Sequence, residues 1–221
     1  MTVSSYMARL KASGNDTQEA VKNISSIGNA QEILNSPSRS LVKHNDVEVY
    51  SIVSDDKKFE TRRFLFVPET SIYKGEYIVH QDLTYLVTEH TIDDLYPQAT
   101  GKVCNFIFPV KVAETKVIVG YNGNRPIYDT VIETVEVASV FTNKTSNLIE
   151  NQPISLPDGV SIVLMPYDPT GRSNPKVNDV IKNRNAQYKV IEINYENVLV
   201  YGTIEKGYIE IRLQKEAVSI E

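Results

Sequence analysis

The chain has 221 residues and a net charge of −5, with 41% hydrophobic and 23% charged residues. These values are typical of a folded protein with a core, and the length fits one domain with room for an appendage. The negative charge argues against a protein that binds free nucleic acid, since such proteins carry a basic surface.

Cys104 is the only cysteine, which excludes an internal disulfide and leaves few ligands for a zinc site. The first residues, MTVSSYMARLKASGND, lack the apolar core of a signal peptide. No apolar run is long enough to span a bilayer. We therefore expect a protein that is made in a reducing cytoplasm and that does not enter a membrane.

The N-terminal part has the pattern of short helices. Ser4 or Ser5 can cap a first helix that closes at Gly14. A second helix opens with a capping box at residues 16–19, is interrupted at Gly28 and ends before Pro37. Its apolar residues recur at helical period: Ala20, Val21, Ile24 and Ile27. Residues 1–45 are therefore expected to form a helical arm that is too thin to fold alone.

From about Asp46 onward, short segments rich in β-branched and aromatic residues alternate with turn residues. This pattern predicts a mainly β fold for residues 46–221, a barrel or sandwich of short antiparallel strands. The strand alternation predicts a set of core residues: Ile78, Tyr85, Val87, Phe106, Phe108, Val190 and Ile211.

Two segments of the β region share one pattern. KGEYIVHQDLTYLVTEH (74–90) and VNDVIKNRNAQYKVIEIN (177–194) both read as strand, turn, strand when Tyr85 is laid on Tyr188. Two explanations remain open, namely duplication of half a barrel and convergence of Asn/Asp-rich hairpins. The shared residues are Ile, Tyr and Val, which set strand register and pack a core, so we expect scaffold and not chemistry.

Residues that could carry chemistry are sparse. His90 with Asp93 and Asp94 offers two convergent metal ligands, where a metal site needs three or four. His80 is expected in solvent at a hairpin tip. Cys104 is expected in a strand, facing the core like a small apolar residue. We predict no catalytic residue, no cofactor and no metal site, and hence no enzyme.

Several short segments follow one another along the chain: Tyr6-Met-Ala-Arg-Leu-Lys-Ala-Ser-Gly, Ile33-Leu-Asn-Ser-Pro-Ser, Lys74-Gly-Glu-Tyr-Ile with Thr84-Tyr-Leu-Val, Val103-Cys-Asn-Phe-Ile-Phe, the hairpin 111–128, and Asn178-Asp-Val-Ile with Tyr188-Lys-Val-Ile and Gly202. Their order resembles that of small head–tail connector, or head-closure (neck), proteins of tailed bacteriophages from low-GC Gram-positive hosts. Tyr85 stands where that family often has Trp, Glu76 stands for Asp, and residues 129–160 match poorly.

The resemblance implies a structural virion protein of the neck, without catalysis. It would form a homo-oligomeric ring between portal and tail and contact the portal or an adaptor and tail proteins. DNA would pass through without specific binding. We then expect partner contacts through the arm, at Tyr6, Arg9, Leu10, Val21 and Ile24. We also expect Asp93 and Asp94 in a loop near the lumen, where they would repel phosphate.

Two other functions remain open. A phage tail or baseplate β-module that binds carbohydrate or protein would favour exposed aromatic platforms, and the absence of Trp counts against it. A small β-barrel enzyme would need a nucleophile or a metal cluster.

Overall fold

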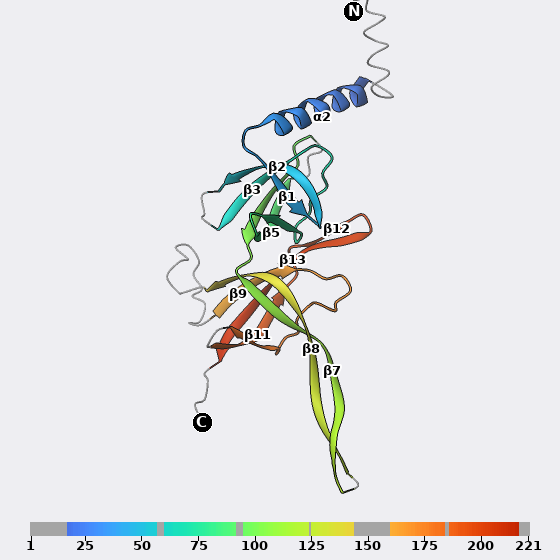
Figure 1. Ribbon diagram of the computed structural model, residues 1–221, viewed down its shortest axis with the longest axis vertical. Coiled ribbons are helices and arrows are strands. Elements are labelled where there is room, and N and C mark those ends of the chain that lie inside the picture. Colours follow the sequence, from blue (N-terminus) through green and yellow to red (C-terminus); the bar gives the residue numbers. More distant parts are fainter. Residues whose placement is uncertain are drawn as a thin grey trace, which may run out of the picture. The chain divides into compact units, whose positions relative to one another are not determined.

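The computed structural model describes residues 17–56, 60–91, 95–123, 125–143, 160–183 and 186–216. Contacts divide the chain into two compact units, residues 1–103 and 104–221. Within the described ranges, one α-helix is present and every other regular element is a β-strand (Figure 1). The predicted fold class, mainly β with a helical N-terminal segment, is confirmed.

The helix α2 spans Thr17–Asn35 and contacts the first two strands of the first unit. It runs through Gly28, so the predicted interruption there is wrong; an internal glycine costs a helix only about 1 kcal/mol. Ile33, near the end of the helix, is buried. The first expected helix lies outside the described residues.

Six strands of the first unit form a closed antiparallel barrel. They are β1 (Arg39–His44), β2 (Val47–Asp55), β3 (Thr61–Phe66), β4 (Tyr77–His80), β5 (Leu83–Thr91) and β6 (Gln98–Val103). The order around the barrel is β1-β2-β3-β6-β5-β4, and β4 pairs back onto β1. The barrel core contains Val42, Phe64, Phe66, Ile78, Tyr85 and Val87.

Two tight turns set the register of this barrel. Asn45 and Asp46 join β1 to β2 with φ angles of 47° and 66°, and Gln81 and Asp82 join β4 to β5 with φ angles of 51° and 62°. Two consecutive left-handed residues match the twist of the flanking strands, and Asn and Asp tolerate this conformation well. Because β1 begins at Arg39, the strand pattern starts inside the segment expected to be helical.

The second unit is a seven-stranded antiparallel sheet. Its strands are β7 (Phe106–Asn122), β8 (Arg125–Asn143), β9 (Val160–Pro166), β10 (Val180–Asn183), β11 (Ala186–Asn194), β12 (Val198–Tyr201) and β13 (Ile204–Glu216). Six follow the order β10-β11-β13-β9-β8-β7, and β12 pairs with β13. The core contains Phe108, Val110, Val163, Met165, Tyr188, Val190, Ile209, Ile211 and Leu213.

The two units share one strand order. Strands β1 to β6 of the first unit correspond, in this order, to β7, β8, β9, β10, β11 and β13 of the second. With this correspondence the two sheets have the same order of neighbouring strands. The difference is the closure: β1 pairs with β4, whereas the described residues of β7 and β10 do not pair. The second unit therefore has the topology of the first with one seam left open.

The repeated hairpins are matched between the units at the level of hydrogen bonds. In the first unit Val87 N donates to Glu76 O at 2.9 Å, and in the second Val190 N donates to Asp179 O at 2.9 Å. A bulge follows each of the two valines, before Glu89 and before Glu192.

The side chain of the acidic residue in each hairpin also accepts a hydrogen bond from a backbone N–H group three residues earlier. A Glu76 carboxylate oxygen accepts from Tyr73 N at 2.9 Å, and an Asp179 carboxylate oxygen accepts from Lys176 N at 2.6 Å. With the shared strand order, these contacts support duplication of a whole six-stranded unit, not of half a barrel.

The predicted core is confirmed. Phe106 is half-buried, and the other expected residues are buried: Ile78, Tyr85, Val87, Phe108, Val190 and Ile211. The prediction for Cys104 is wrong, because β6 ends at Val103, β7 begins at Phe106, and Cys104 lies half-buried between the two strands.

Candidate functional site

A buried pair of polar side chains closes the barrel of the first unit. His44 Nε2 lies 2.8 Å from Glu76 Oε2, and both side chains are only 9% exposed. Asn45 Nδ2 donates to the other carboxylate oxygen of Glu76 at 3.1 Å. The pair ties the end of β1 to the segment before β4, which is the seam where the barrel closes. Sequence reasoning missed this pair, because nothing local connects two residues that lie 32 positions apart.

The second unit lacks this pair. When the buried serines Ser51 of β2 and Ser139 of β8 are matched, Val110 takes the position of His44. Asp179 stands in place of Glu76 and is one methylene shorter. An apolar side chain opposite a shorter acid cannot form the bridge, which is a physical reason for the open seam.

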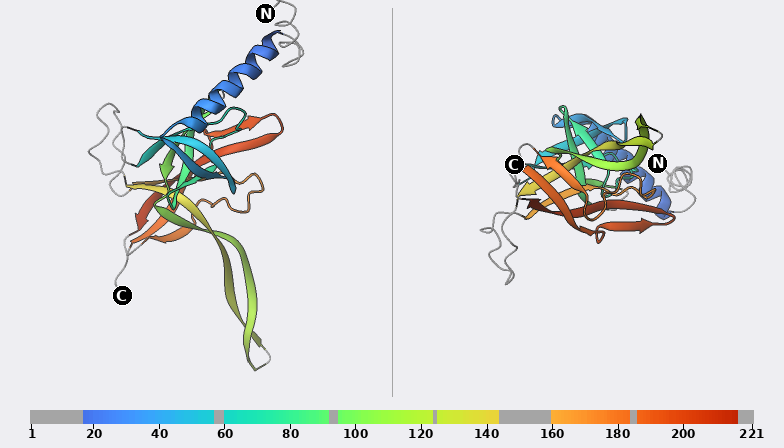
Figure 2. Two further views of the ribbon diagram at one scale, coloured as in Figure 1. Left: turned by 45° about the horizontal axis from the view of Figure 1, so that its top comes forward. Right: turned by 90° about the horizontal axis from the view of Figure 1, so that it is seen from below.

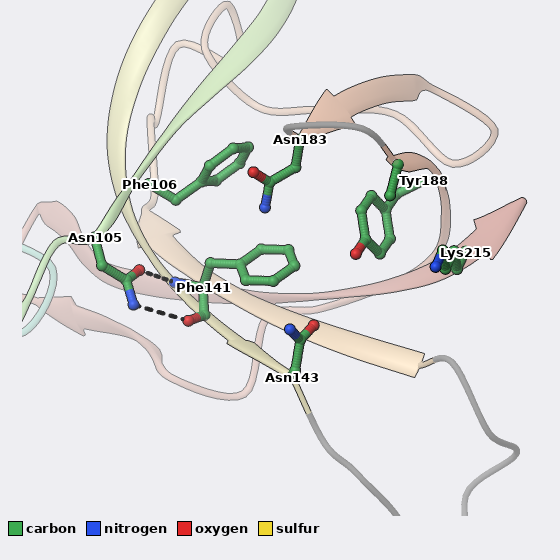
Figure 3. Close-up of a pocket in the computed structure, with 8 residues that line it drawn as sticks. Asn105, Phe106, Phe141, Asn143, Asn183, Tyr188 and Lys215 are labelled. Carbon is green, nitrogen blue, oxygen red and sulfur yellow. Dashed lines mark hydrogen bonds between the residues drawn. The ribbon is translucent and has the colours of Figure 1, made fainter.

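A pocket of about 430 Å³ lies at one end of the second unit (Figure 3). It is lined by aromatic, amide and cationic side chains: Asn105, Phe106, Phe141, Asn143, Asn183, Tyr188 and Lys215. The first unit fills the matching end with Phe64, whose ring meets Tyr85 edge-on at 5.4 Å. The residue of β9 that matches Phe64 is the smaller Val163.

The wall of this pocket is held rigidly. Asn105 Nδ2 donates to the backbone carbonyl of Phe141 at 3.0 Å, and the side-chain oxygen Oδ1 of Asn105 accepts from Phe141 N at 2.7 Å. The Phe141 ring meets Tyr188 edge-on at 5.6 Å and lies 5.4 Å from Phe106. A ring-shaped group with a polar or anionic edge, which Lys215 could meet, fits such a lining.

The hairpin of β7 and β8 extends far beyond the rest of its sheet as a two-stranded ribbon (Figures 1 and 2). β8 pairs with β9 only from Val140 onward, and β7 has β8 as its strand partner within the described residues. The matching hairpin of the first unit turns after six residues of β1, at Asn45 and Asp46. The ribbon is thus an elaboration of the second unit.

Large apolar side chains of the ribbon are uncovered. Nine of them are 40–67% exposed: Val117, Ile118, Val119, Tyr121, Ile127, Tyr128, Val131, Ile132 and Val135. An isolated two-stranded hairpin is at best marginally stable in water. Within the described residues, the ribbon therefore exposes apolar side chains that its own sheet does not cover.

A close ion pair lies on the ribbon. Lys111 Nζ donates to a carboxylate oxygen of Glu114 at 2.5 Å. This hydrogen bond, together with the positive charge of Lys111, lowers the pKa of the Glu114 carboxyl. Glu114 is therefore ionised at neutral pH.

The helix α2 has one attached part and one uncovered part. Asn29 Nδ2 donates to the carbonyl of Leu95 at 3.3 Å, and the Tyr96 hydroxyl donates to Asn29 at 2.9 Å. Before that point Val21, Ile24 and Ile27 are 52–60% exposed. Of the predicted partner-binding residues, Val21 and Ile24 lie on this uncovered part. Tyr6, Arg9 and Leu10 lie outside the described residues, as do Asp93 and Asp94.

The prediction that His80 is solvated is wrong. Its side chain is buried, with the ring edge-on to Phe64 at 6.4 Å. Burial, and then the charge of Arg62, lower the pKa of His80. The imidazole is therefore neutral at physiological pH and packs as part of the barrel.

His90 lines a smaller pocket of about 240 Å³ together with Arg63, Glu89 and Gln98. Burial and Lys74 lower the pKa of His90, and Glu76 opposes them. Among the described residues, no group of three or more His, Cys, Asp or Glu side chains is placed to hold a metal. Because residues 93 and 94 are not described, the prediction of no metal site stays a prediction.

The part of the chain that the structure describes contains no helix with both the length and the apolarity that crossing a membrane requires.

The fold defines a mainly β protein of two tandem units that share a topology, the second opened at one seam and extended by a ribbon. The family model for the YomX C-terminal domain matches residues 104–214, half of the chain and most of the second unit. The chain belongs to this family.

A relative supports the same assignment. The SPbeta prophage-derived uncharacterized protein YomX of Bacillus subtilis (strain 168) is 29% identical over 160 residues, which cover 70% of this chain and 71% of that protein. A prophage-derived relative agrees with the phage origin that the sequence resemblance implied.

Among solved structures, MrkH, titled a c-di-GMP-dependent transcription regulatory factor, aligns over 90% of this chain and 85% of its own. The sequence identity is 12% and the TM-score is 0.22. A likeness at that TM-score carries no argument about fold or function.

Proposed function

We propose that this protein is a structural subunit of a tailed phage particle, and specifically a head–tail connector that forms a ring between portal and tail. The prophage-derived relative supports the phage origin. The observation that carries the assembly role is the uncovered apolar surface of α2 and of the β7–β8 ribbon.

The size of this surface favours assembly over a monomeric existence. Monomeric proteins rarely expose contiguous apolar patches beyond a few hundred Å². On the ribbon nine large apolar side chains are 40–67% exposed, and Val21, Ile24 and Ile27 form a separate uncovered stretch on α2. We propose that each of these two surfaces is covered by another subunit or partner in the assembled particle.

The proposal includes DNA transit without specific binding. A chain with a net charge of −5 repels phosphate, so DNA would move past without adhering. Asp93 and Asp94 are proposed to act at the lumen. Replacing both by Asn should leave folding and ring assembly intact and change DNA retention or release, measured on assembled particles. Release identical to that of the parent would remove these two residues from the proposed role.

The test of the connector role is genetic and structural. A phage that lacks this gene should produce DNA-filled heads and separate tails, and expression of the chain in trans should restore joined particles. Electron microscopy of particles with a tagged chain should place the tag at the neck. Joined, infectious particles without the gene would overturn the proposal, as would a tag at the tail tip.

The pocket favours a second candidate function, a tail or baseplate β-module that binds carbohydrate or protein. Its aromatic wall and asparagine side chains suit a sugar or a peptide side chain. In that case Lys215→Ala, at an exposed side chain of the pocket lining, should weaken binding of the purified protein to host cells, while Tyr195→Ala, an exposed control outside the lining, should not. Particles without the gene would then keep a joined neck and lose adsorption.

A further inference from the structure

The outer edge of β7 contains a regular segment between two irregularities. Bulges lie between Lys111 and Ala113 and between Ile118 and Gly120, so residues 113–118 form an even stretch of strand. Its other edge is occupied by β8, in the register Thr115 to Val131. Within the described residues no strand pairs with the outer edge, so its backbone amide and carbonyl groups can accept another strand.

The side chains of this segment are complementary to themselves. An antiparallel copy centred on Thr115 places Glu114 opposite Lys116 of the other chain, and places Lys116 opposite Glu114. The same register sets Ala113 opposite Val117 and brings the two Thr115 residues together. Opposite residues of antiparallel strands share a face, so the charges meet directly.

Neighbouring registers lose this match. A pairing centred on Glu114 places two carboxylates opposite each other, and one centred on Lys116 places two ammonium groups opposite each other. Like charges directly opposite each other destabilise a strand pair. The charges therefore select the register centred on Thr115.

We propose that two copies of this chain pair antiparallel through the outer edge of β7, centred on Thr115, and join their ribbons into a four-stranded sheet. A second copy is the occupant because the edge is complementary in charge to its own antiparallel copy, with Glu114 opposite Lys116 at both ends of the contact, a property that an unrelated partner would have no reason to match. The contact is two-fold, with the same residues on both sides.

This inference goes beyond the proposed function. A ring between head and tail repeats one contact in a single direction, whereas a two-fold contact turns the copies to face opposite ways. Pairing through β7 can therefore hold free subunits in pairs or join two rings, and it leaves α2 available for other contacts.

A cysteine on the proposed axis gives the most direct test. In a Cys104→Ser background, Thr115→Cys should form a disulfide-linked dimer under mild oxidation. Opposite Cα atoms of antiparallel strands are about 4.5–5.5 Å apart, which suits a disulfide. Ala113→Cys and Val117→Cys are the matched controls. Each alone should stay monomeric on a non-reducing gel, because its own copy lies roughly 13 Å away along the strand.

The two controls mixed in equal amounts should cross-link to each other, because Ala113 faces Val117. Absence of the Thr115→Cys dimer would overturn the proposal. Equal cross-linking of all three single variants would also overturn it, since that result would show that the two strands meet without a fixed register.

Charge exchange provides a second, independent test. Lys116→Glu should weaken the dimer by about tenfold or more, since it places like charges opposite each other twice. Glu114→Lys should weaken it as well, and it also removes the ion pair with Lys111 of its own chain. The double exchange should restore dimerisation, measured by sedimentation equilibrium. Glu133→Lys, on the opposite face of the ribbon, should leave it unchanged. Failure of the double exchange to recover while the fold stays intact by circular dichroism would contradict the register. These experiments measure pairing of the free chain and not particle assembly, so their outcome does not decide the connector role.

Discussion

Asp168 organises the loop between β9 and β10 through its carboxylate. One oxygen accepts from Thr170 N at 2.8 Å, and the other accepts from Ser173 N at 2.8 Å. Burial tends to raise the pKa of this carboxyl, but the hydrogen bonds from Ser173 and Thr170 outweigh it, and the pKa lies below its usual range. The folded chain therefore favours the charged form.

Replacing Asp168 by Ala should destabilise the protein by about 1–2 kcal/mol, because two backbone donors lose their acceptors. The loss should depend on pH. A lowered folded-state pKa contributes stability that is complete above the ordinary Asp pKa of about 3.9 and disappears as the pH falls through the folded value. Urea unfolding from pH 7 to pH 2 should show the parent and the variant converging in acid. A constant difference down to pH 2 would contradict this assignment.

The contribution of the His44–Glu76 pair to stability can be measured by giving the first unit the apolar residue that the second unit has at the position of His44. His44→Val copies the matched residue Val110 and should cost about 2–4 kcal/mol, because it leaves a buried carboxylate without its main partner. Adding Glu76→Leu should recover much of that loss, since an apolar pair needs no compensating charge. Chemical unfolding followed by circular dichroism measures both. A double variant no better than the single one would show that the pair is not the closing contact.

At the scale of elements, the repeated hairpins make an internal comparison possible. Val87 and Val190 occupy the same place in the two hairpins, and both are fully buried. Truncating either to Ala should cost about 1–3 kcal/mol through lost burial. Val200→Ala, at a side chain that is 69% exposed, should cost far less. A Val190→Ala variant as stable as Val200→Ala would contradict the strand assignment.

The helix α2 has a buried residue near its end, Ile33, and an uncovered apolar stretch before it. Val21→Ser with Ile24→Ser should leave the melting temperature nearly unchanged, because both side chains are about half exposed. The same change should weaken assembly with a partner if the connector proposal holds.

Deleting residues 1–36 should leave a soluble protein that no longer assembles, measured by light scattering with portal protein. Ile33→Ser is the contrasting control and should lower stability, since Ile33 is buried.

At the scale of the whole molecule, duplication followed by divergence explains the arrangement of functions. The first unit keeps a closed barrel, and its short β1–β2 hairpin offers little contact surface. The second unit has the open seam, the pocket and the ribbon. The family match covers this second unit. The two units thus differ in closure, and the 430 Å³ pocket and the ribbon both belong to the second unit.

The sequence by itself determined the local features. Period-two alternation predicted the strands. The same alternation identified core residues such as Ile78, Tyr85, Phe108 and Val190, because alternate residues of a strand face the same side and the buried side is apolar. It also showed the hairpin repeat. A prediction from a single local cue failed at His80, since the barrel wall, and not the hairpin turn, decides whether that side chain reaches water.

Only the tertiary structure decided which strands pair at a distance. The closure of β1 on β4, the His44–Glu76 pair and the open seam of the second unit all depend on contacts between residues far apart in sequence. The ribbon is the clearest case. It is as rich in β-branched and aromatic residues as a core strand, and that composition does not state whether a second layer covers the strand. Coverage is a property of the assembled fold, which leaves these side chains uncovered.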